Sequence, residues 1–107
     1  MPKDDYFVIA YQVLSHLYSC LKKGKSPDSA ILDAPYFGIV QSYWDYIIRN
    51  LHQGGHISGV LVIELRDYPD GAVRIQPNAQ ITPKGIQYLE ENSMLQKAKS
   101  AIKDIAA

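Results

Sequence analysis

The chain has little cysteine and no excess of either charge. Cys20 is the only cysteine among 107 residues, so an intramolecular disulfide and a thiolate metal cage are excluded. Lysine and arginine number 11, as do aspartate and glutamate, so no overall field attracts nucleic acid or acidic lipid. No apolar run is long enough to span a bilayer, and the N-terminus carries no signal-peptide cleavage pattern. We therefore expect a cytoplasmic protein that does not associate with membranes.

Sequence signatures of catalysis are also missing. The chain contains no phosphate-binding glycine loop, no Gly-x-Ser-x-Gly elbow and no carboxylate pair placed beside a nucleophile. His52 and His56 are spaced like metal ligands on a helix, but Gly54 and Gly55 interrupt that helix between them. We therefore expect neither an enzyme nor a cofactor or metal site.

The segment 39–53 has the clearest helical pattern in the chain. At about 100° per residue, one side of this helix is apolar, and it carries Val40, Tyr43, Trp44, Ile47, Ile48 and Leu51. The opposite side carries hydrogen-bonding groups, namely Gln41, Ser42, Asp45, Tyr46, Arg49, His52 and Gln53. The pattern predicts a helix with one side in the core and the other side open to a partner.

Two helices are predicted before this segment. Apolar spacing predicts a helix over about 4–23, which Gly24 ends. Ser26-Pro27-Asp28 has the residues of a helix start, and Pro35 is expected to end that helix, so a short helix over about 27–33 is predicted.

A hairpin and two more helices are predicted after it. Residues 56–65 are rich in β-branched side chains, residues 67–71 have turn chemistry, and 72–75 alternate again, which together predict a hairpin over about 56–75. Thr82-Pro83 begins a helix over about 83–91, and Ser93 with Gln96 begins a last helix over about 94–105.

This order of elements predicts a single domain over 1–107, of the α+β class and mostly α. Two helices joined by a turn and followed by a hairpin have the outline of a winged helix-turn-helix. The expected architecture is a three-helix core, a β-hairpin wing and an extra C-terminal helix.

One run of residues resembles a known family. The run from Ile81 to Ala98 (ITPKGIQYLEENSMLQKA), together with Gly38-Ile39 and the segment Gly54 to Gly59, resembles the YjcQ-like proteins of Gram-positive bacteria and their prophages. The resemblance covers most of the chain, and Ile-Thr-x-Lys-Gly-x-x-Tyr-Leu-x-Glu-Asn-Ser is its specific part. It implies a small winged-helix domain with an added C-terminal helix, and it implies no catalytic residues.

A winged helix that binds DNA places its second helix in the major groove and its wing on the backbone or minor groove. This logic predicts a DNA-associated or regulatory module of phage or prophage type. The residues that would contact double-stranded DNA are Gln41, Ser42, Asp45, Tyr46 and Arg49 on the helix and Arg66, Arg74 and Lys84 at the wing.

Two alternatives stay open. The same polar residues are equally expected if they only solvate a surface helix, and the tyrosine-rich composition also suits a domain that binds a host or phage protein without nucleic acid. The last helix carries an apolar stripe that would either form a homodimer or fold back on the first helix. That stripe consists of Met94, Leu95, Ala98, Ile102 and Ile105, with Ala101 between them.

Overall fold

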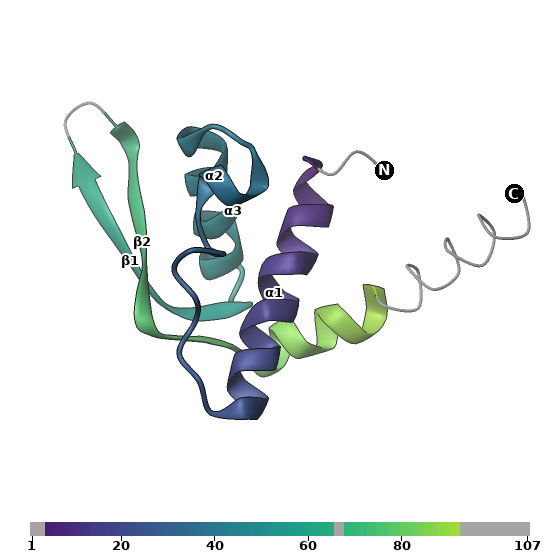
Figure 1. Ribbon diagram of the computed structural model, residues 1–107. Coiled ribbons are helices and arrows are strands. Elements are labelled where there is room, and N and C mark those ends of the chain that lie inside the picture. The colour runs from purple at the N-terminus through teal and green to yellow at the C-terminus, as the bar shows by residue number, and fades with distance from the viewer. Residues whose placement is uncertain (1–3, 66–67, 93–107) are drawn as a thin grey trace, which may run out of the picture.

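The computed structural model describes residues 4–65 and 68–92 (Figure 1). Helix α1 (Tyr6–Lys23) is followed by the short α2 (Ala34–Phe37) and by α3 (Gln41–Gln53). Strands β1 (Ile57–Leu65) and β2 (Tyr68–Ile81) form an antiparallel hairpin, and a further helix spans 83–92. The α+β, mostly helical class predicted from the sequence is confirmed.

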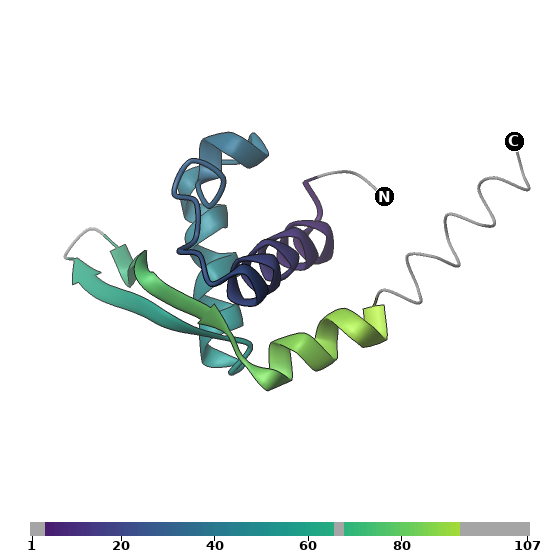
Figure 2. The same cartoon turned by 60° about the horizontal axis from the view of Figure 1, so that its bottom comes forward.

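The core lies between α1, α3 and the hairpin. The largest side chains with almost no exposed surface are Ile9, Val13, Leu14 and Leu17 on α1 and Ile47 and Ile48 on α3. The hairpin contributes Ile57, Val73 and Ile81 to the same cluster, and the helix at 83–92 contributes Leu89. Figures 1 and 2 agree that the hairpin and this last helix extend from the helical core on opposite sides.

The hairpin contains one strong irregularity. Ser58 pairs with Gln80 but Val60 pairs with Ile75, so residues 76–79 of β2 lie opposite Gly59 alone. Gly59 has φ +76°, and a Cβ at this position would lie 2.6 Å from the Cα of Ala79. Only glycine combines that conformation with so close an approach of two backbones. The hairpin therefore bends here, and β2 continues to Ile81 instead of ending near residue 75 as the sequence predicted.

The predicted helix over 27–33 is wrong. Asp28 organises a turn instead, because its carboxylate accepts from the Ala30 N–H at 2.9 Å and its carbonyl accepts from the Leu32 N–H at 3.0 Å. The helix begins later, at Ala34, where the Asp33 carboxylate caps the Ala34 N–H at 2.9 Å. Pro35 lies in the first turn, where its missing N–H costs no hydrogen bond, so it begins α2 rather than ending its predecessor.

The other boundaries need smaller corrections. Helix α1 begins at Tyr6 and α3 at Gln41, each slightly later than predicted, and the helix predicted over 83–91 spans 83–92. The helix predicted over 94–105, with its apolar stripe, lies outside the described residues. Of the helices that the structure does describe, none is both long and apolar enough to cross a membrane.

Candidate functional site

The exposed side of α3 is the strongest candidate for a binding surface. Ser42, Tyr46 and Gln53 are exposed and Asn50 is half-buried, and these four residues follow one another at helical spacing. We call them the outer face of α3. The Asn50 amide donates to the Tyr46 carbonyl at 2.7 Å, which leaves its side-chain oxygen as an acceptor. The outer face is thus neutral, polar and centred on a tyrosine.

Asp45 does not belong to this surface, and the prediction that it lies on the exposed side of the helix is wrong. Its side chain is only 4% exposed, and its Oδ1 accepts a hydrogen bond from Gln41 Nε2 at 2.9 Å. Gln41 is itself exposed, but this bond turns its amide towards Asp45. Both residues line a cleft between α3 and β2. Because Asp45 is the only acid in α3, its burial leaves the outer face without a carboxylate.

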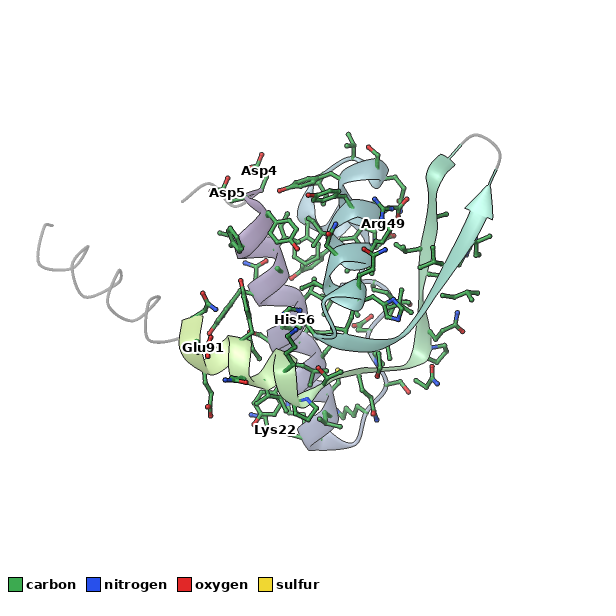
Figure 3. The ribbon with its side chains drawn as sticks, turned by 180° about the vertical axis from the view of Figure 1, so that it is seen from behind. Asp4, Asp5, Lys22, Arg49, His56 and Glu91 are labelled. Carbon is green, nitrogen blue, oxygen red and sulfur yellow. The ribbon has the colours of Figure 1, made fainter. Side chains whose placement is uncertain are left out.

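The predicted cations do not all surround the outer face. Arg49 is half-buried one turn beyond Asp45, and Figure 3 shows it on the side of α3 nearer the hairpin. Lys84 is exposed and lies beside Gly55, just past the end of α3. Arg74 is exposed on β2 but lines the cleft that holds Asp45. Arg66 lies outside the described residues.

Aromatic side chains adjoin the outer face on the side of α1. Tyr46 packs edge-on against Tyr6 with ring centroids 6.1 Å apart, and Tyr6 packs edge-on against Phe7 at 5.2 Å. Phe7 remains 62% exposed and Tyr46 51% exposed. We call Tyr6, Phe7 and Tyr46 the aromatic surface. The sequence placed Tyr6 and Phe7 on the first helix but did not show that they meet α3.

His56 lies where α3, β1 and the helix at 83–92 meet (Figure 3). Its carbonyl accepts from the Thr82 N–H at 3.1 Å, and its ring packs edge-on against Tyr88 with centroids 5.6 Å apart. The Nδ1 atom is buried and has no hydrogen-bond partner among the described residues. Burial, reinforced by the nearby Lys84 ammonium, lowers the pKa of His56 below its ordinary 6.5.

This lowered pKa predicts acid sensitivity of the fold. Between the folded-state pKa and 6.5, the unfolded chain binds more protons than the folded chain, so the free energy of unfolding falls as pH falls through this window. Replacing His56 by phenylalanine keeps a ring against Tyr88 and removes the titrating group. Urea denaturation at pH 7 and pH 5 should show a smaller loss of stability in His56→Phe than in the natural chain. A His52→Gln variant keeps His56 and should lose as much as the natural chain; equal losses in all three would contradict the assignment.

His16 connects α1 to the loop that follows it. The Asp28 N–H donates to His16 Nε2 at 3.1 Å, and Cys20 Sγ lies 3.5 Å from the same nitrogen. This contact attaches the loop after α1 to the helix itself. Across residues 4–65 and 68–92, no three His, Cys, Asp or Glu side chains are grouped so that they could hold a metal ion.

Comparison with known proteins gives one result. No curated protein and no solved structure matches the chain. Residues 11–106 match the profile of the family described as YjcQ protein, which spans α1 after its first turn, α2, α3, the hairpin and the helix at 83–92. Since this match covers far more than half of the chain, the protein belongs to the YjcQ family.

Proposed function

We propose that this chain is a winged-helix module that binds double-stranded DNA through the outer face of α3 and serves as a regulatory protein. The order α1, α2, α3 and hairpin supports the winged-helix assignment, with α3 as the helix that enters the major groove and the hairpin as the wing. Fold alone does not imply DNA binding, so the argument depends on the exposed side of α3.

The burial of the Asp45 side chain is the observation that carries this proposal. A carboxylate on a reading helix would repel the phosphate backbone, and the burial of Asp45 removes the only one that α3 has. The outer face instead presents the amides of Asn50 and Gln53, which suit the N6 and N7 positions of adenine, and the Ser42 hydroxyl, which is permissive. Arg49 and Lys84 provide positive charge beside this face.

The proposal predicts weak, salt-sensitive binding to mixed-sequence duplex DNA. Each phosphate contact contributes about −0.9 to the slope of log K against log salt, so contacts from Arg49 and Lys84 give a slope of about −2 per chain. Arg49→Gln and Lys84→Gln should each reduce the size of this slope by about 1. Fluorescence anisotropy of a labelled duplex, titrated at several salt concentrations and with the oligomeric state of the protein known, measures the effect.

Lys22→Gln is the matched control. Lys22 lies over the Tyr18 ring near the C-terminal end of α1, away from Arg49 (Figure 3). Its replacement changes the net charge by the same amount as the other two variants but should leave the slope of log K against log salt unchanged. If no binding is detected even at low salt, or if all three variants behave alike, the proposal fails.

The aromatic surface supports a second candidate, a protein-binding module on the same fold. Tyrosine and phenylalanine are enriched at protein interfaces, and Phe7 and Tyr46 keep more than half of their surface exposed while packing through Tyr6. Such an interface would need no phosphate contact, so the absence of salt-sensitive DNA binding would favour it.

A further inference from the structure

A cleft separates the start of α3 from β2. Its volume is about 590 Å³, within the range of about 300 to 1,000 Å³ that small-molecule sites occupy. Three segments form its walls: the loop before α2, the first turns of α3 and the middle of β2. The lining residues used below are Leu32, Asp33, Gln41, Trp44, Asp45 and Arg74.

Two carboxylates line this cleft. Asp45 is almost fully buried and Asp33 is exposed. Each already accepts one hydrogen bond within the chain, Asp45 from Gln41 Nε2 and Asp33 from the Ala34 N–H. Both bonds use the Oδ1 atom, so each carboxylate keeps an oxygen that can accept from a ligand. A buried acid that lines an open space is a costly arrangement unless a cation or donors complete its surroundings.

One cation also lines this cleft. Arg74 lines the cleft from β2, and within the described part of the chain it forms no ion pair with Asp33 or Asp45. Charges of both signs therefore line one space without neutralising each other. A ligand that carries an ammonium and a carboxylate could pair with charges of both signs at once through charge-assisted hydrogen bonds.

The balance of charges narrows the ligand further. Two carboxylates and one guanidinium complement a ligand with two positive groups and one negative group. Leu32 and Trp44 are buried apolar residues that line the same cleft, and they suit a short methylene chain between the charged ends.

We propose that this cleft binds a free basic amino acid of the lysine type. The carboxylate of the ligand pairs with Arg74, and its two ammonium groups pair with the carboxylates of Asp33 and Asp45. The site does not overlap the outer face of α3, because Gln41 and Asp45 lie on a different side of that helix from Ser42 and Tyr46. Ligand binding therefore does not depend on DNA binding, and either proposal can fail without the other.

Isothermal titration calorimetry of the full chain with L-lysine tests the proposal. Two comparators each lack one charged group: cadaverine has no carboxylate, and L-norleucine has no side-chain ammonium. Because charge-assisted hydrogen bonds contribute about 1.5 to 3 kcal/mol, each comparator should bind at least about tenfold more weakly than lysine. Asp45→Asn and Arg74→Gln should weaken lysine binding by at least the same factor, while Lys23→Gln, an exposed cation at the end of α1, should not change it.

Three results would overturn the proposal. The first is that lysine does not bind the natural chain. The second is that lysine binds Asp45→Asn and Arg74→Gln as tightly as it binds the natural chain. The third is that cadaverine binds the natural chain as tightly as lysine does. Circular dichroism shows whether Asp45→Asn is folded; if it is not, Arg74→Gln decides the outcome, because Arg74 is exposed and its replacement leaves the core intact.

Discussion

Replacing Gly85 by alanine is expected to lower the free energy of unfolding by about 2 to 3 kcal/mol, the cost of overpacking a tight contact. Gly85 lies in the first turn of the helix at 83–92, where the Thr82 hydroxyl accepts from its N–H at 3.2 Å. A Cβ here would overlap the His56 carbonyl oxygen and lie 2.6 Å from Cγ1 of Ile81. Neither neighbour can move easily, since the His56 carbonyl accepts from the Thr82 N–H and Ile81 is buried in the core.

The sign of the stability change in Gly85→Ala separates the packing contact from helix propensity. Alanine in place of glycine inside a helix ordinarily stabilises by about 1 kcal/mol, so a large loss identifies the contact and not the helix propensity. Gln87→Ala, at an exposed position of the same helix, should stay within about 0.5 kcal/mol of the natural chain. Urea denaturation of the three proteins measures both changes, and a Gly85→Ala protein at least as stable as the natural chain would contradict the close packing of Gly85 against His56 and Ile81.

Ile48→Ala is expected to lower the free energy of unfolding by about 2 to 5 kcal/mol, because it removes a fully buried side chain and leaves a cavity. Val40→Ala should change it by less than about 0.5 kcal/mol. Both residues fall on the apolar side of the helix predicted over 39–53. In the structure, however, Val40 precedes α3 as its N-cap residue and is 69% exposed.

The comparison therefore separates apolar spacing from actual burial. Denaturation curves of the two variants, recorded under one set of conditions, provide the measurement. Similar losses in Ile48→Ala and Val40→Ala would mean that the start of α3 is packed differently from the described structure.

Features that depend on local chemistry could be predicted from the sequence. The apolar spacing in α1 and α3 decides which side of each helix enters the core, and glycines at their ends mark where they stop. Thr82-Pro83 gave the start of the helix at 83–92 for the same reason, because the threonine cap is a contact between residues close in sequence.

Features that depend on distant contacts could not be predicted. Asp33 caps α2 although Ser26 also has a good capping side chain, and Leu32 and Ala34 on either side of Asp33 are buried in the core. The length of β2 depends on the pairing of Ile57 with Ile81 across the bend at Gly59. A local turn signal at Pro77-Asn78 does not reveal that pairing.

The candidate site shows the same division. Helical spacing correctly separated Ser42, Tyr46 and Gln53 from the core side of α3, but it does not reveal what lies beside each position. Asp45 therefore looked like a surface acid, whereas β2 and the loop before α2 enclose it together with Trp44. Asn50 was overlooked, although its spacing of four from Tyr46 places it on the same side.

A nuclear magnetic resonance titration of the full chain with a mixed-sequence duplex at low salt tests the proposed DNA interface most directly. The backbone amides of Ser42, Tyr46, Asn50 and Gln53 should show the largest shifts, with smaller changes near Lys84. Shifts confined to Tyr6 and Phe7, or no shifts at any duplex concentration, would contradict the proposal that α3 reads DNA.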